Sequence, residues 1–387
     1  MVMIKEVSAK SILDSRGEKT IFVSIKSNTG AFSASAPNGK SRGKHEAKTY
    51  KKNLEEDIKT IKKFSDYFSE EQIEKFEDLR RIEDIVDGHI GANTLFALES
   101  AVLKALAKEK RKQIWEIIEP EIKKKKFPRL VGNCIGGGLH SDSSKKPDFQ
   151  EFLLIPDLKS VKENFEKNKS IKKEIEFPLK DSDKNFKGEK NDEDAWATSL
   201  NEKEILDIMN KKEVPLGVDV ATSSFYKKKL YHYKNPMLKR TPEEQLGYLS
   251  NLIKNFELFY IEDPFHEEDF ENFALLLKKF PGRLIIGDDL TVTNYKRAKK
   301  AIEKKSISAI IVKPNQCGSL LEVKRVCELA KENKIKIVFS HRSGETEETI
   351  LADLAFGFQA DFFKCGITGK VREVKLKRLI EIEKGLR

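Results

Sequence analysis

Six charged or polar side chains lie at or near the ends of short apolar runs in the second half of this chain, and their types suit metal-assisted carbanion chemistry. These residues are Asp219, Glu262, Asp288, Lys313, His341 and Lys364. Carboxylates are the ligands that Mg²⁺ prefers, and a lysine at the end of a buried strand needs a charged partner or a chemical task. A single acid or lysine in such a place is usually a solvated loop residue. Six residues in corresponding positions argue against that interpretation.

The runs before these residues have the length and composition of buried strands, being short and rich in β-branched or aromatic side chains. The runs cover Val214–Val220, Leu258–Ile261, Leu284–Ile286, Ile307–Val312, Ile335–Phe339 and Asp361–Phe363. Segments of helical character, such as Tyr295–Lys304 and Leu320–Lys331, separate them. Repeated strand and helix units of about 30 residues indicate a closed barrel, whose active site lies at the C-terminal ends of its strands. We therefore expect the six residues to lie together at one end of the barrel.

The first third of the chain has a different pattern. Alternating apolar residues from 4 to 36 predict antiparallel strands, and apolar residues at helical spacing predict the helices Leu54–Phe68, Glu70–Asp84 and Thr94–Lys108. We therefore predict an α/β protein in which a smaller α+β domain, residues 1–127, precedes a β/α barrel, residues 128–387. Residues 157–213 are dense in charged side chains, and part of that segment is expected to be mobile.

Composition narrows the class of protein. The chain has 387 residues and a formal net charge of +10, from 73 basic and 63 acidic side chains, which indicates a solvated, lysine-rich surface. A phosphorylated anionic substrate would gain from this charge, whereas no motif of a nucleic-acid-binding module is present. Neither a signal peptide nor a transmembrane run is apparent. Four cysteines without metal-ligand spacing favour a reducing compartment, so we expect a cytoplasmic protein.

Several short motifs have to be considered together. They are SILDSRG from Ser11, PNGKSRGKHEA from Pro37, GGGLH from Gly136, QEF from Gln150, GVDVATSSFY from Gly217, IEDPF from Ile261, GDDLTVTN from Gly287, KPNQCGS from Lys313 and SHRSGETEET from Ser340. In this order the motifs resemble enolase, in a divergent form of archaeal type, over nearly the whole chain. The resemblance implies a TIM-like enolase barrel and a hydro-lyase that uses two Mg²⁺ per active site, a chemistry already known for enolase-superfamily enzymes.

The resemblance also implies a role for each matching residue. The implied metal ligands are Asp219, Glu262 and Asp288 for the first Mg²⁺ and Ser41, in a mobile loop of residues 37–47, for the second. Lys313 would be the base that removes a proton. The implied substrate-binding residues are His140, Glu151, Glu262, Asp288, His341, Arg342, Ser343 and Lys364. Without the resemblance, the 37–47 loop would be a polar turn and Arg342 a surface ion pair.

The general acid is the residue that the resemblance assigns least directly. The family has Gly-Asp-Glu-Gly-Gly where this chain has Asn191–Ala195, and Glu193 occupies the central position. Glu189, which follows Gly188, is a rival candidate. A second departure lies after Lys364, where Ile367–Val371 replaces the family's Ala-Pro-x-Arg-Ser.

The function implied by the resemblance is the reversible dehydration of 2-phosphoglycerate to phosphoenolpyruvate in glycolysis and gluconeogenesis. The implied assembly is a homodimer or an octamer built from dimers. Two alternatives stay open at this point. The chain could be an enolase-like protein with impaired turnover that serves as a binding or structural partner, or another dehydratase of the same superfamily.

Overall fold

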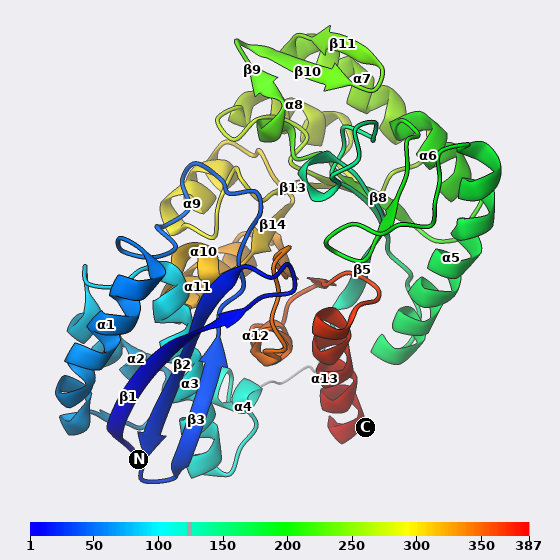
Figure 1. Ribbon diagram of the computed structural model, residues 1–387. Coiled ribbons are helices and arrows are strands. Elements are labelled where there is room, and N and C mark those ends of the chain that lie inside the picture. Colours follow the sequence, from blue (N-terminus) through cyan, green and yellow to red (C-terminus); the bar gives the residue numbers. More distant parts are fainter. Residues whose placement is uncertain (122–125, 387) are drawn as a thin grey trace.

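A four-stranded sheet forms the N-terminal part of the computed structural model, which describes residues 1–121 and 126–386 (Figure 1). The sheet has the order β3-β2-β1-β4, and all its neighbouring strands are antiparallel. Its strands are β1 (Val2–Leu13), β2 (Lys19–Ser27), β3 (Gly30–Ser35) and β4 (Gln72–Ile73). Alternate residues such as Ile21, Val23 and Ile25 are buried, as expected for a sheet with one covered face. The antiparallel strands predicted for residues 4–36 are therefore present.

Four helices accompany this sheet, and α3 packs against β2 and β3. The helices are α1 (Leu54–Phe64), α2 (Leu79–Val86), α3 (Ala92–Lys110) and α4 (Ile114–Ile118). The prediction of a helix over Glu70–Asp84 is wrong in its first half, because Gln72 and Ile73 form the edge strand β4, which pairs with β1. The apolar side chain of Ile73, which contributed to the helical spacing in the sequence, is buried in the edge strand instead. The helix α2 begins only at Leu79.

Eight strands close into a barrel, since β16 at one end of the sheet also pairs with β5. The barrel strands are β5 (Arg129–Gly136), β6 (Glu151–Leu154), β8 (Leu216–Asp219), β12 (Tyr260–Glu262), β13 (Leu284–Gly287), β14 (Ala309–Val312), β15 (Lys336–Ser340) and β16 (Phe362–Lys364). Only β6 runs antiparallel to its neighbours β5 and β8. Every residue of β14 is buried, so both faces of that strand are covered. The predicted α/β barrel is confirmed.

The remaining elements surround the barrel or extend from it. The helices are α5 (Val161–Ser182), α6 (Glu202–Met209), α7 (Pro242–Asn255), α8 (Phe270–Lys279), α9 (Tyr295–Glu303), α10 (Pro314–Cys317), α11 (Leu320–Glu332), α12 (Ile350–Gly357) and α13 (Lys370–Leu386). The small sheet of β9 (Tyr226–Lys227), β10 (Leu230–Lys234) and β11 (Met237–Arg240) lies beside α7, at the top of Figure 1. The two-residue strand β7 (Trp196–Ala197) pairs with β5.

Residues 157–213, which we expected to be partly mobile, contain two helices. The apolar side chains of α5 are few, but Phe165, Ile171, Ile175 and Leu179 recur at helical spacing and are all buried. Lysine and glutamate fill the exposed positions of α5, and both are strong helix formers. The density of charge in this segment therefore reflects a solvated helix face. None of the helices in the described residues is long and apolar enough to cross a membrane.

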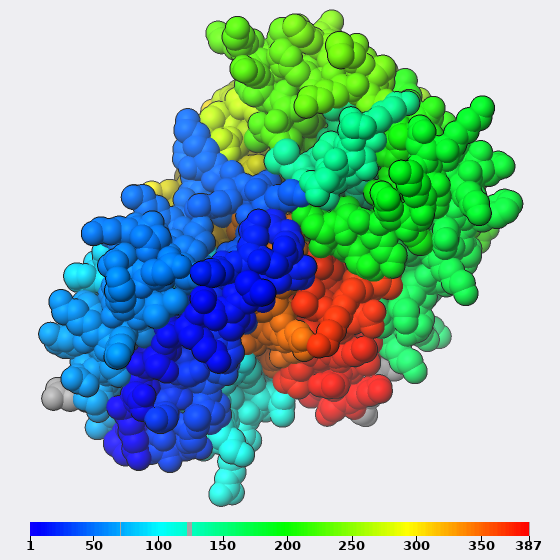
Figure 2. All heavy atoms as spheres, viewed as in Figure 1, coloured from blue at the N-terminus to red at the C-terminus, as the bar shows by residue number. Residues whose placement is uncertain are grey.

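A segment from the N-terminal part of the chain meets a segment from its C-terminal part near the mouth of the barrel. Figure 2 shows the N-terminal segment (blue) lying against the C-terminal segment (orange and red). The backbone of Asn38 exchanges two hydrogen bonds with that of Gly344, at 2.7 and 2.9 Å. The 37–47 loop is thereby placed over the C-terminal ends of the barrel strands.

Candidate active site

The six residues selected from the sequence lie at the same end of the barrel. Asp219, Glu262 and Lys364 are the last residues of β8, β12 and β16, while Asp288, Lys313 and His341 directly follow β13, β14 and β15. Because parallel strands of a barrel end at one rim, this register brings the side chains together. A cavity at this rim is lined by residues from both parts of the chain: Gly39, Lys40, Ser41, His140, Gln150, Glu151, Glu193, Lys313, Ser340, His341, Arg342, Ser343 and Lys364.

Lys364 is the centre of a buried charge cluster. Its ammonium lies 3.0 Å from Asp219 Oδ2, 2.9 Å from Glu262 Oε2 and 3.2 Å from Glu151 Oε1. Burial alone would lower the pKa of Lys364, but the three carboxylates raise it well above its ordinary value. The ammonium is therefore charged and held in a fixed place.

Lys313 makes a similar pair with Asp288. Its ammonium donates a hydrogen bond to Asp288 Oδ2, and Gln316 Nε2 donates to Asp288 Oδ1 at 3.0 Å. Burial opposes the charged form of Lys313, yet the adjacent carboxylate raises the pKa of the ammonium above its usual value. Our sequence reasoning assigned no role to Gln316, although it belongs to the KPNQCGS motif. The fixed spacing of Gln316 after Lys313 is the signal that could have identified it.

The carboxylates at this rim fit a divalent cation. Glu262 is fully buried, and its Oε1 has no hydrogen-bond partner among the described residues. Burial, together with the neighbouring charge of Asp219, raises the pKa of Glu262 to about 7. A cluster of buried acids with an unsatisfied oxygen gains from a hard cation, and Asp219, Glu262 and Asp288 offer only oxygen donors. In this structure the ammonium groups of Lys313 and Lys364 partly neutralise them.

Asp263 and Asp289 are further acids that the sequence reasoning left without a role. Asp263 accepts hydrogen bonds from the backbone N–H groups of Asp288 and Asp289, at 2.9 and 2.8 Å. Ligand oxygens of Asp263, Asp288 and Asp289 lie within 4.8 Å of one another. Asp263 thus holds the turn after β13 in the conformation that presents Asp288.

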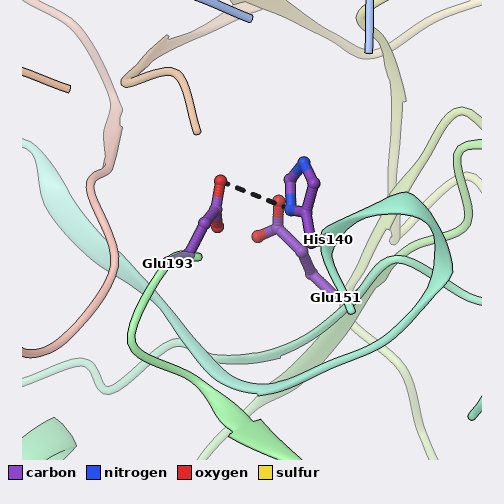
Figure 3. A group of neighbouring side chains, drawn as sticks. All are labelled: His140, Glu151 and Glu193. Atoms are coloured by element: carbon purple, nitrogen blue, oxygen red, sulfur yellow. Dashed lines mark ion pairs between the residues drawn. The ribbon is translucent and has the colours of Figure 1, made fainter. Parts of the chain in front are cut away.

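Glu193 lies on the opposite side of the cavity, facing two histidines. Its carboxylate oxygens are 3.4 Å from His140 Nδ1 and 3.6 Å from His341 Nε2, and Asn133 Nδ2 donates to it at 3.0 Å. Figure 3 shows Glu193 facing His140, with Glu151 beside them. The rival candidate Glu189 is exposed and does not line the cavity.

Two opposing effects set the protonation of Glu193. Burial raises the pKa of its carboxyl, while positive charge on His140, His341 and Arg372 lowers the pKa below the ordinary value. However, burial also lowers the pKa of His341 well below 6.5, so that this ring is neutral at pH 7. The pKa of Glu193 therefore depends on which of its neighbours carry charge.

The third part of the cavity is lined by cationic and hydroxyl groups. Arg342 forms a bidentate ion pair with Glu46, at 3.0 and 3.1 Å, and donates to Ser41 O at 3.1 Å. Ser343 Oγ accepts hydrogen bonds from the backbone N–H of Lys40 at 2.8 Å and from Arg16 Nη1 at 3.0 Å. Such a set of donors suits a phosphate group.

Arg16 and Glu46 belong to motifs that the sequence analysis identified, SILDSRG and PNGKSRGKHEA, but neither received a role. Both are charged residues that lie next to glycine or within a glycine-containing loop, where a solvated side chain is the ordinary interpretation. Their contacts with Ser343 and Arg342 depend on the folding of the first 50 residues over the barrel.

Comparison with known proteins agrees with this architecture. Residues 4–118 match the family model described as "Enolase, N-terminal domain", and residues 124–387 match "Enolase, C-terminal TIM barrel domain". The chain is 36% identical to an enolase of Methanosphaera stadtmanae, covering 99% of this chain and 97% of that one. It is 35% identical to enolases of Natronomonas pharaonis, covering 99% of each chain, and of Pyrobaculum aerophilum, covering 98% of this chain and 96% of the relative.

Proposed function

Because this chain belongs to the enolase family of lyases, in a divergent form of archaeal type, we propose that it converts 2-phosphoglycerate reversibly to phosphoenolpyruvate by Mg²⁺-dependent dehydration. One observation carries the proposal. A half-buried lysine, Lys313, and a buried carboxyl, Glu193, line the same cavity as a set of donors suited to phosphate. A base, an acid and an anion site in one cavity are what a β-elimination requires.

Lys313 removes the C2 proton in the proposed reaction. It must be neutral to do so, and in this structure Asp288 favours its charged form. Engagement of Asp288 as a metal ligand would weaken that effect, and the charge of Lys364 nearby would lower the pKa of Lys313 further. Lys364 and the metal site would also bind the substrate carboxylate.

Asp219, Glu262 and Asp288 would hold the first Mg²⁺, and Ser41 would contribute to the second. Bound Mg²⁺ supplies positive charge that stabilises the dianionic enolate formed when the C2 proton leaves. The carboxylates are pre-arranged for this purpose, since Lys364 and Gln150 hold Asp219 at 3.0 and 3.2 Å.

Glu193 protonates the departing C3 hydroxyl. An anionic substrate in the cavity would raise the pKa of this buried carboxyl and favour the protonated form that a general acid needs. Arg342 and Ser343 would bind the phosphate. To do so, Arg342 would have to break its ion pair with Glu46 and pair with the phosphate instead. Breaking this ion pair would release the 37–47 loop, which carries Glu46. We propose that the loop opens and closes over the bound substrate.

The division of the chain at residues 127 and 128 into two domains is also a proposal, as is assembly into a homodimer or an octamer of dimers. Mass determination in solution by light scattering would test the assembly. A cytoplasmic location is consistent with the four cysteines, which are all free thiols.

The direct test is formation of phosphoenolpyruvate, followed by absorbance, from 2-phosphoglycerate and millimolar Mg²⁺. We expect activity that disappears when the metal is chelated and returns when Mg²⁺ is restored. The Lys313→Ala variant should lose roughly 10²–10⁴-fold in kcat, the usual contribution of a general base. Lys299→Ala, on the exposed face of α9, is the control. Absence of turnover by the wild type, or full activity of Lys313→Ala, would refute the proposal.

A further inference from the structure

The loop that carries Glu193 is held by contacts both within it and with distant parts of the chain. Asn191 Oδ1 accepts the backbone N–H groups of Glu193 at 3.0 Å and Ala195 at 2.9 Å, which closes a tight turn. Within that turn Asp194 has φ +62°, in the left-handed region where a side chain is costly. Aspartate tolerates this region better than most residues, and an interaction outside the turn adds to the hold on Asp194.

That interaction comes from a buried lysine on α5. Lys172 is 4% exposed, and its ammonium lies 3.0 Å from Asp194 Oδ2. The same ammonium donates hydrogen bonds to the backbone carbonyl of Asp194 and to Thr368 Oγ1, and Thr368 in turn donates to Asp194 Oδ2. Trp196 Nε1 donates to the carbonyl of Lys172 at 2.8 Å, which ties the end of the loop to the helix.

Thr368 connects this cluster to the neighbouring strand of the barrel, since β16 pairs with β5. It lies in the segment that follows β16, four positions after Lys364. Asp194 immediately follows Glu193. One ammonium therefore joins the segment carrying the proposed proton donor to the segment carrying the proposed substrate-binding lysine. Both segments are stretches in which the sequence departs from the enolase pattern, Asn191–Ala195 and Ile367–Val371.

We propose that Lys172, acting through Asp194 and Thr368, is a positioning residue that sets the place of the Glu193 carboxyl relative to the substrate held by Lys364. The inference rests on the function proposed above. None of the three residues lines the cavity, so they act through the backbone and not on the substrate. Proton transfer is sensitive to such positioning, since a shift of about 1 Å can cost roughly 100-fold in rate.

A buried ion pair costs desolvation energy and is weak support for a purely stabilising role. Fixing one geometry is the role that such a pair performs best. If Lys172 were replaced by an apolar side chain, the carboxylate of Asp194 would lose its buried cation and keep only the exposed ammonium of Lys190, at 3.3 Å. The loop would then relax, and Glu193 would move with it, whereas Lys313, which follows β14 and pairs with Asp288, would keep its place.

The experiment separates the two proton transfers in the full-length protein. Exchange of the C2 proton of 2-phosphoglycerate with solvent deuterium, followed by NMR, reports on Lys313, whereas phosphoenolpyruvate formation also requires Glu193. For Lys172→Met we expect kcat to fall ~10–100-fold with KM within ~3-fold of wild type. The exchange rate should stay within ~3-fold of wild type, because the base is not displaced.

A second variant tests the mechanism of the effect. The double variant Lys172→Met/Asp194→Gly removes the carboxylate that paired with Lys172 and places glycine at the left-handed position. The kcat of this double variant should be at least ~5-fold higher than that of Lys172→Met. Such non-additive effects are expected of residues in contact. Thr368→Val is a milder change in the same cluster and should also lower kcat. This variant tests the proposal if Lys172→Met does not fold. Lys173→Met, an exposed position on α5, is the matched control.

The outcomes distinguish this inference from the proposed function. A wild type with neither exchange nor turnover would refute the proposed function and this inference with it. An active wild type whose Lys172→Met variant loses exchange and turnover equally, or loses neither, would overturn the positioning role alone.

Discussion

Individual side chains in the cavity are held by opposite charge before any ligand is present. Lys364 contacts three carboxylates, and Lys313 contacts Asp288. A buried charge without such partners would change its protonation state instead. Each lysine therefore stays protonated until another cation takes over its carboxylate. At the scale of residues, the site is preorganised for a divalent metal and an anion.

The choice between Glu193 and Glu189 is tested at this scale. Glu193→Gln keeps the shape of the side chain but cannot deliver a proton, so phosphoenolpyruvate formation should fall by roughly 10²–10⁴-fold. Exchange of the C2 proton should persist, since Lys313 is unchanged. Glu189→Gln makes the same chemical change at an exposed position and should leave kcat within about twofold, as surface changes usually do. The opposite ranking in a steady-state assay would exclude Glu193 as the acid.

The elements position these residues in two different ways. The barrel strands do so by register, since Asp219 pairs with Glu262 across β8 and β12, and Ser340 pairs with Lys364 across β15 and β16. The loops do so by close contact. A Cβ atom on Gly39 would lie 1.9 Å from Arg342 Nη2, so only glycine lets the 37–47 loop approach the arginine. The N-terminal loop and the barrel rim are thus fitted to each other.

Substitution of Gly39 tests whether this close approach matters for turnover. In Gly39→Ala the added methyl group would collide with the guanidinium of Arg342. The loop would then close incompletely, and we expect kcat/KM for 2-phosphoglycerate to fall ~10–100-fold, the scale of a misplacement of about 1 Å. The measurement is a steady-state titration with substrate at saturating Mg²⁺.

Gly247→Ala is the matched control for this prediction. Gly247 lies in α7, and a Cβ atom there would meet no other atom within 4 Å. Alanine favours a helix over glycine, so the control should fold at least as stably as the wild type. Equal kcat/KM values for both variants would show that the loop does not need to approach Arg342.

The whole molecule carries buried acids outside the cavity, and one of them makes stability depend on pH. Glu202 is 2% exposed at the start of α6 and accepts a hydrogen bond from the backbone N–H of Asp148 at 2.7 Å. Burial raises the pKa of Glu202 from 4.5 to about 7. A raised folded-state pKa means that the native protein binds this proton more tightly than the unfolded chain. Its contribution is complete below pH 4.5 and is lost as the pH rises through 7.

Glu202→Gln should remove this dependence, because the amide oxygen can still accept the Asp148 hydrogen bond without becoming charged. At pH 8 we expect the unfolding free energy of the variant to exceed that of the wild type by up to about 3 kcal/mol, with a correspondingly higher unfolding temperature. Near pH 4.5 the two proteins should be equally stable. Calorimetry at a series of pH values would measure the difference. Glu243→Gln, exposed on α7, is the control, and a pH-independent difference for Glu202→Gln would contradict the assignment.

Sequence patterns alone were enough to predict the class of fold, six of the barrel strands and the polar residues at their ends, but not the antiparallel strand β6. Strand and helix patterns are local, and the ends of parallel strands meet at one rim, so the sequence predicts that Asp219, Glu262, Asp288 and Lys364 lie together. The motifs around them then indicated the enolase family, which the comparisons show.

Tertiary structure decided the contacts between segments that are distant in the chain. The ion pair of Arg342 with Glu46 and the cluster of Lys172 with Asp194 and Thr368 each join parts that no local pattern connects. The strand β4 is a similar case, because pairing at a sheet edge outweighs the helical spacing of its residues. Such contacts depend on burial and charge in the folded chain, and these exist only once the barrel and the N-terminal sheet have come together.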